Sequence, residues 1–458
     1  EVSEDYRTAI FAAYADMDLP GLDERVSRLA SELNQKDLSD SMAVLLDEWL
    51  REGAEAKKRW VLYAAAIHGG EALVPVLCRQ IDVWSKNARG VMAGEAARAL
   101  VLGGTTEALL WADKASRSHK SGQVKKAALK ALSEAAKVLG IHPEELEDRI
   151  VPTFGFDQNR ERVFDYGTRT FRAVLTFSLE VEIFDETGKQ LKHIPAPGKK
   201  EEDLKALEAY GAFKKMKKQL KDVAASQKQR LERVLTTERQ WSADSWKALF
   251  VNNPVMNLFA WGLIWGRYEG DVLVETFRYM EDGSFNTEEE TLYEFPKEGT
   301  IGLIHPVELS QQLLEKWREQ LSDYEVAQPF LQIDRPVYRP KEKERKESQL
   351  TRFQGKTVNG FSLAGKLLRQ GWMRGPVEGG GFYHSFFYRD GDMEAELEFS
   401  GSLVGAEMEE VTIGELGFYR WAENKGEKNT KKNCILMEVK PRYFSEVVKM
   451  VEEIFSVF

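Results

Sequence analysis

The sequence predicts a multidomain protein in which an N-terminal helical array, an α-solenoid, is followed by two α+β domains. Three observations support this fold class. Residues 1–150 place alanine and leucine at helical spacing with few prolines, strand-like alternation begins after Pro152, and a charged segment at 341–350 precedes a second mixed region. The length of 458 residues suits about three domains, and 43% apolar residues suffice for packed cores.

The helical region, residues 1–150, carries a repeated signal. Gly69-Gly70 and Gly103-Gly104 each follow an alanine-rich helix and precede another apolar helix, and they are 34 residues apart. This period is typical of helical-hairpin repeats, and small alanines let neighbouring helices approach closely. We therefore expect a HEAT-like array, with an irregular helical bundle as the alternative.

Residues 151–340 predict the first α+β domain, because short alternating stretches are mixed with helices without a βαβ rhythm. Asp185-Glu-Thr-Gly188 has the composition of a hairpin turn, and Ser242 is a good N-cap. The expected elements are strands within 163–184, a charged helix at 201–236, a helix after Ser242, a strand at 272–280 and a helix at 309–321.

Residues 341–350 are predicted to be a charged linker, and residues 351–458 the second α+β domain. In that domain, glycines separate apolar stretches that alternate like strands. The expected elements are a helix at 363–370, strands at 382–389, 393–399 and 433–439, and a closing helix at 443–455.

Composition limits the classes of function. A formal charge of −10 argues against a general nucleic-acid or anionic-membrane binder. The only two cysteines, Cys78 and Cys434, cannot form a disulfide framework, which suits a reducing cytoplasm. The longest uncharged stretch, 248–266, contains a proline and three asparagines, so we expect it in a soluble core and not in a bilayer.

Catalytic, metal and cofactor motifs are incomplete or missing from the sequence. The six histidines are scattered, with no HExxH and no Cys-x-x-Cys pair. Residues 360–366 have the glycine spacing and lysine of a phosphate-binding loop, but Leu367 occupies the position of the hydroxyl residue. The sequence therefore predicts no catalytic residue, metal site or cofactor.

One polar group favours a ligand pocket. His305 and Glu308 lie between an expected strand and helix, where imidazole and carboxylate could share a proton or orient a ligand. The alternative is that His305 caps or packs this junction. The predicted pocket residues are His305, Glu308, Asp334, Arg335 and Tyr338, with Trp241 and Trp265 as possible walls.

A basic helix offers a second candidate surface. Residues 199–233 contain 11 basic and six acidic side chains, and the strongest cluster is Lys214, Lys215, Lys217 and Lys218. These lysines could bind nucleic acid. The alternative is that the helix docks on an acidic part of its own chain, because residues 269–326 contain 15 acids and four bases.

The middle region resembles a known family. The motifs Arg239-Gln-Trp-Ser-Ala-Asp-Ser-Trp246, Asn253-Pro-Val-Met256, Gly302-Leu-Ile-His-Pro-Val-Glu-Leu309 and Arg335-Pro-Val-Tyr338 occur in the order found in bacterial MolR-like proteins carrying domain of unknown function 4132. The resemblance covers residues 125–375. It implies a cytoplasmic bacterial protein with helical repeats ahead of this domain, and a MoxR-type AAA+ ATPase or a von Willebrand A protein as partner. It supplies no catalytic residues.

Three functions follow as hypotheses. The first is a regulatory or scaffolding protein that binds a protein partner through its helical-repeat surface. The second is an enzyme or small-ligand sensor with a pocket near His305 and Arg335. The third is nucleic-acid binding through the basic helix.

Overall fold

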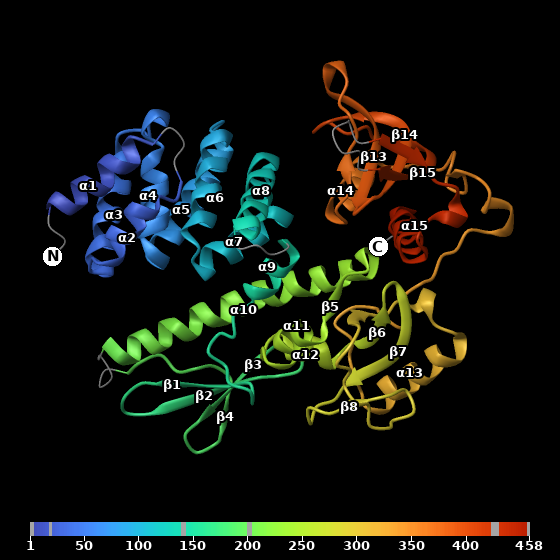
Figure 1. The fold of residues 1–458 in the computed structure, drawn as a ribbon, viewed down its shortest axis with the longest axis horizontal. Helices are drawn as coiled ribbons and strands as arrows, with labels where there is room; N and C mark the ends of the chain where they lie inside the picture. The colour runs from blue at the N-terminus through green and yellow to red at the C-terminus, as the bar shows by residue number, and fades with distance from the viewer. Residues whose placement is uncertain (1–3, 18–20, 139–142, 199–203, 423–429, 456–458) are drawn as a thin grey trace. The chain divides into compact units, whose positions relative to one another are not determined.

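The computed structural model describes residues 4–17, 21–138, 143–198, 204–422 and 430–455 (Figure 1). The chain divides into two compact units, of which the first comprises Glu1–Asp157 with Lys214–Val223, and the second comprises Gln158–Phe213 with Ala224–Phe458. The first unit is helical, and the second contains three antiparallel sheets with helices. A helical region followed by sheet-rich α+β regions confirms the predicted order of classes.

Nine helices form most of the first unit in its described part. Polar N-caps start several of them: the side chains of Asp23, Asn34 and Thr105 each accept backbone N–H groups of the following turn. The helices are α1 (Glu4–Ala15), α2 (Glu24–Ser31), α3 (Gln35–Arg51), α4 (Trp60–His68), α5 (Gly70–Lys86), α6 (Gly90–Gly103), α7 (Thr106–Ser118), α8 (Gly122–Val138) and α9 (Pro143–Arg149).

The helices of this unit pair along the chain as α3–α4, α5–α6 and α7–α8, and α6 also packs against both α4 and α8. The two glycine pairs occupy equivalent positions, since α4 and α6 end there and Gly70 and Gly104 have φ of 61° and 66°. Gly103 allows close contact: a Cβ there would lie 2.3 Å from the carbonyl oxygen of Ala66. Small residues thus set the helix spacing.

The second unit begins with a meander of β1 (Glu161–Asp165), β2 (Thr170–Leu175), β3 (Val181–Asp185) and β4 (Gln190–Leu191). Burial alternates along β2, and the expected hairpin turn is present, with Gly188 at φ 81°. Helix α10 (Leu204–Thr237) follows, and the predicted residues 201–203 lie outside the described residues. Its Phe213 ring packs edge-on against Phe164 of β1, with ring centres 5.3 Å apart.

The second sheet has the order β5-β9-β6-β7-β8. An aromatic core fills one face, around the fully buried Trp246. Ser242 caps the helix that carries Trp246, as predicted, by accepting the Ser245 N–H. The strands are β5 (Gln240–Ser242), β6 (Ile264–Glu269), β7 (Val272–Tyr279), β8 (Phe285–Asn286) and β9 (Thr300–Leu303), and the helices are α11 (Ala243–Trp246), α12 (Met256–Trp261) and α13 (Gln311–Asp323).

Two glycines in this sheet position a tyrosine. Gly266 of β6 and Gly302 of β9 are cross-strand partners. A Cβ on either would lie 3.0–3.1 Å from Cε2 of Tyr268, so the ring lies over the space left by two missing side chains. On the same face as this ring, Trp317 of α13 donates at 3.1 Å to Thr276 of β7, which is the cross-strand partner of Gly266.

The third sheet has the order β10-β15-β14-β13-β12, with β11 and β16 also paired to β15. Apolar side chains of two helices and of the central strands share one core. The strands are β10 (Gln349–Leu350), β11 (Thr357–Val358), β12 (Met373–Arg374), β13 (Phe382–Asp390), β14 (Met393–Leu403), β15 (Val411–Ala422) and β16 (Thr430–Asn433), and the helices are α14 (Gly360–Arg369) and α15 (Pro441–Phe455).

The strand predicted at 433–439 is wrong. β16 ends at Asn433, and a 3-10 turn, Leu436–Glu438, follows. Leu436 and Val439 are buried because their side chains enter the core from an irregular segment and not from a strand. The long central strand β15 is missing from the prediction, since Gly414 and Gly417 interrupt its apolar pattern.

The segment predicted as a linker, 341–350, contains a 3-10 turn, Glu342–Glu344, and strand β10. The Glu344 carboxylate accepts from the Lys341 N–H at 2.8 Å and from Arg352 at 2.6 Å. These contacts give the segment a defined conformation.

Over the described ranges, no helix is both long enough and apolar enough to cross a membrane. The uncharged stretch at 248–266 forms instead a π-helical turn, α12 and the start of β6, with most of its side chains buried in the second unit.

Candidate functional site

The turn after β9 is built by its own side chains. Pro306 begins a 3-10 turn, and His305 precedes it as the N-cap. The His305 Nδ1 accepts the Val307 N–H at 3.0 Å, while the Glu308 carboxylate accepts the His305 N–H at 3.0 Å. This reciprocal capping holds the imidazole in one orientation. The capping role weighed for His305 from the sequence is therefore present.

The other side of the His305 ring meets helix α15. Because Nδ1 is an acceptor, the ring proton is on Nε2, which donates to the Glu446 carboxylate at 3.1 Å. Arg335 completes the group: its Nε and Nη2 each donate to Glu446 at 2.6 Å. His305 and Glu446 are 0% and 1% exposed, so water does not screen this group.

Burial and hydrogen bonding set the charges of this group in opposite ways. Burial opposes ionisation of Glu446, but hydrogen bonds from His305 and Arg335 outweigh it and lower the Glu446 pKa to about 2. Burial lowers the pKa of His305 and outweighs its bond to Glu446. The group therefore contains a carboxylate, a guanidinium and a neutral imidazole.

A second ion pair lies one helical turn earlier on α15. Arg442 donates to Glu308 at 2.6 Å and also to the hydroxyl of Tyr268, which lies 3.1 Å from the same carboxylate. Burial raises the pKa of Tyr268, so the phenol stays protonated. Between the two charged residues of α15, Ser445 accepts the Tyr338 N–H at 3.0 Å. The turn after β9 and the segment 335–338 are thus fastened to one face of α15.

Three of the predicted pocket residues, His305, Glu308 and Arg335, are brought to this face, where their polar groups pair with each other and with α15. The sequence did not reveal Arg442 and Glu446, which lie in an amphipathic helix more than 100 residues away. A charged residue buried within an apolar stripe is the only sequence signal that could have indicated them.

The other predicted residues lie elsewhere. Asp334 is exposed and pairs with Arg318 of α13 at 2.7 Å, and the half-buried side chain of Tyr338 packs against the core of the third sheet. Trp241 and Trp265 are buried in the aromatic core, with ring centres 6.0 Å apart. The Trp265 Nε1 donates to the Ala260 carbonyl at 3.0 Å.

The four lysines of the basic cluster are exposed on the part of α10 that belongs to the first unit. Lys215 pairs with Glu107 of α7 at 3.0 Å, and Gln219 donates to the same carboxylate. One turn further along α10, Asp222 pairs with Lys114 at 3.0 Å. Part of this helix's charge is therefore matched by α7 of its own unit.

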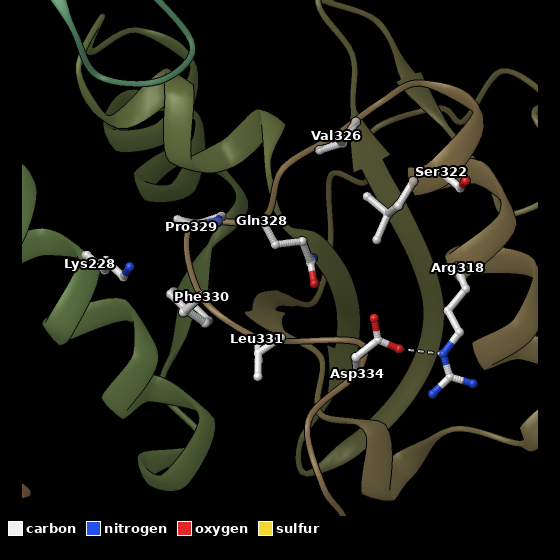
Figure 2. A pocket seen from close by; sticks show the side chains of 10 residues that line it. Lys228, Arg318, Ser322, Val326, Gln328, Pro329, Phe330, Leu331 and Asp334 are labelled. Carbon is white, nitrogen blue, oxygen red and sulfur yellow. Dashed lines mark hydrogen bonds and ion pairs between the residues drawn. The ribbon is translucent and has the colours of Figure 1, made fainter. Parts of the chain in front are cut away.

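An open groove of about 650 Å³ lies on the second unit (Figure 2). The chain segment 326–334 runs through it, with α13 on one side and Lys228 of α10 on the other. Its lining residues are Lys228, Arg318, Leu321, Ser322, Val326, Gln328, Pro329, Phe330, Leu331 and Asp334. Asp334 is the predicted pocket residue that reaches this groove.

Among the residues whose structure is described, no three side chains that could bind a metal ion lie in one cluster.

Comparison with known proteins identifies part of the chain. A curated relative, "Uncharacterized protein YehI" of Escherichia coli (strain K12), is 31% identical over 359 residues, which is 78% of this chain. The aligned part is 29% of the relative, so the chain spans less than a third of its length. No solved structure gives a significant match.

Residues 188–372 match the family described as domain of unknown function (DUF4132). This match confirms the domain that the motifs of the middle region indicated. It covers the second sheet, the His305 turn and the groove, while Arg442 and Glu446 lie beyond it.

Proposed function

We propose that this chain is a regulatory or scaffolding protein that binds a protein partner through the surface of its helical unit. The observation that carries the proposal is the serial packing of the pairs α3–α4, α5–α6 and α7–α8, with α6 against both α4 and α8. This serial packing supports the predicted α-solenoid, whose extended surface would suit a protein partner.

The chemistry of the second unit agrees with a binding role. The residues that the sequence favoured for a reactive or ligand pocket, His305, Glu308 and Arg335, each hydrogen-bond to a side chain of α15. An ionised carboxylate and a guanidinium in fixed mutual contact stabilise the position of a helix.

Exposed apolar side chains give the helical surface positions to test. Val44 of α3 and Val83 of α5 are 58% and 47% exposed on neighbouring helix pairs. A glutamate at either position adds charge without removing core packing. Val163 of β1, 61% exposed on the second unit, supplies a matched control.

The experiment measures binding of the purified full chain to the MoxR-type AAA+ ATPase of the same organism, with its von Willebrand A protein as the second candidate, by biolayer interferometry. The proposal expects a measurable complex that Val44→Glu with Val83→Glu weakens at least about tenfold, while Val163→Glu leaves it unchanged. A complex weakened only by Val163→Glu, or the absence of binding to both candidates, would refute this assignment.

A further inference from the structure

The segment 326–334, which forms the middle of the groove, is held in place by buried hydrogen bonds to the second sheet. Gln332 is fully buried and exchanges hydrogen bonds with both backbone groups of Ile264, at 2.9 and 2.8 Å, and donates to the Ile304 carbonyl at 3.0 Å. These contacts tie the segment to β6 and to the end of β9. Its outward side chains, including Leu331 at 60% exposure, are therefore presented in a fixed arrangement.

The segment is also tied to α10, the helix that carries Lys228. Arg335, at the end of the segment, donates to the Leu331 carbonyl at 2.9 Å and to Glu232 of α10 at 3.0 Å. Glu232 follows Lys228 by one turn of α10, so this ion pair fixes the distance between the lysine and the segment. A groove whose width is fixed before a ligand arrives loses less conformational entropy on binding.

Charge and shape define the ligand. The groove combines apolar surface from Val326, Pro329 and Leu331 with two cationic groups, Lys228 and Arg318. Asp334 pairs with Arg318 at 2.7 Å, so its carboxylate already occupies the place where an external anion would bind. The volume of about 650 Å³ suits a small organic molecule.

We propose that this groove binds a small organic anion with an apolar body, whose acidic group pairs with Arg318 while its apolar part covers Leu331 and Pro329, and that the charge of Lys228 on the opposite side of the groove adds to the attraction. Asp334 acts as an internal competitor for Arg318. This site lies on a different unit from the surface in the proposed function, so either proposal can fail alone.

The test uses 8-anilinonaphthalene-1-sulfonate, an apolar aromatic sulfonate, as the probe, and fluorescence titration of the full chain at low salt. Arg318→Gln and Lys228→Gln should each weaken binding about two- to fivefold, as for partly exposed ion pairs. Asp334→Asn should strengthen binding by a similar factor, because it removes the competing carboxylate.

Two controls separate a charge effect from a change in folding. Lys221→Gln removes an exposed lysine of α10 that is outside the groove lining and should leave the affinity unchanged. Arg318→Lys keeps the charge and should bind the probe within about twofold of the original chain. If Asp334→Asn and Arg318→Gln change the affinity in the same direction, or if Lys228→Gln behaves like Lys221→Gln, the proposal is overturned.

Discussion

Replacing Glu446 by glutamine tests whether the buried ion cluster holds α15 in place. The variant keeps the size of the side chain but removes its charge. Arg335, which is 6% exposed, then loses its buried carboxylate partner and keeps the half-buried Glu232, while the Nε2–H of His305 loses an anionic acceptor.

The magnitude follows from the geometry. The carboxylate accepts three hydrogen bonds, of which the two from Arg335 are 2.6 Å long and bidentate. Solvent screens none of them, because both partners are buried. Removing one partner of a buried ion pair costs about 3–5 kcal/mol, and the lower end, about 3 kcal/mol, is expected here because Glu232 stays 3.0 Å from Arg335. The opening of α15 should therefore become easier by about two orders of magnitude.

Native-state hydrogen exchange of the full chain measures this opening, since it reports stability segment by segment in a multidomain protein. Glu452→Gln, a half-buried position on the same helix, is the matched control and should change exchange in α15 by less than about tenfold. Combining Glu446→Gln with Arg335→Met should cost less than the sum of the two single changes, because both remove the Arg335–Glu446 interaction.

A cost below about 1 kcal/mol for Glu446→Gln, or full additivity with Arg335→Met, would refute the reasoning that this cluster fastens the helix.

Three further outcomes are expected. Acid should weaken the second unit in two stages. The folded-state pKa values of His305 and Glu446 lie below their ordinary values of 6.5 and 4.5, so the unfolded chain binds more protons than the folded chain. The free energy of unfolding should therefore fall below about pH 6.5, and again from about pH 4.5 towards 2. Urea unfolding across this pH range checks the effect, and Glu446→Gln should reduce the lower stage, to which other carboxyl groups with lowered pKa values, such as Glu275 and Glu344, also contribute. Gly103→Ala should destabilise the helical unit by about 1–3 kcal/mol, because the new Cβ would lie 2.3 Å from a backbone oxygen. Gly122→Ala, whose Cβ would have no atom within 4 Å, should not destabilise it, and thermal unfolding compares the two variants. Gln332→Leu should lower the free energy of unfolding by about 2–4 kcal/mol and make the groove segment less rigid, because three buried backbone groups lose their bond to the Gln332 amide. Mass spectrometry should then show faster hydrogen exchange at residues 328–334.

Local signals were enough to predict much of the secondary structure. The glycine pairs at 69–70 and 103–104 end helices because glycine, without a Cβ, adopts the positive φ found at Gly70 and Gly104 at the lowest steric cost. Ser242 and the 185–188 turn make their hydrogen bonds with residues at most four positions away, so their structure can be predicted from the local sequence. The strand prediction at 433–439 was wrong because apolar side chains also enter a core from irregular segments, so their pattern does not distinguish the two structures.

The sequence by itself determined the order of a helical region and two mixed regions, the unknown-function domain, and the polar residues His305, Glu308 and Arg335. Only the tertiary structure decided what those residues do, because their partners Glu446 and Arg442 are more than 100 residues away in the chain. A buried carboxylate selects its partners by distance in space, which no local pattern encodes. The same contacts that fasten α15 hold the segment beside Asp334, and so define the groove whose ligand remains to be tested.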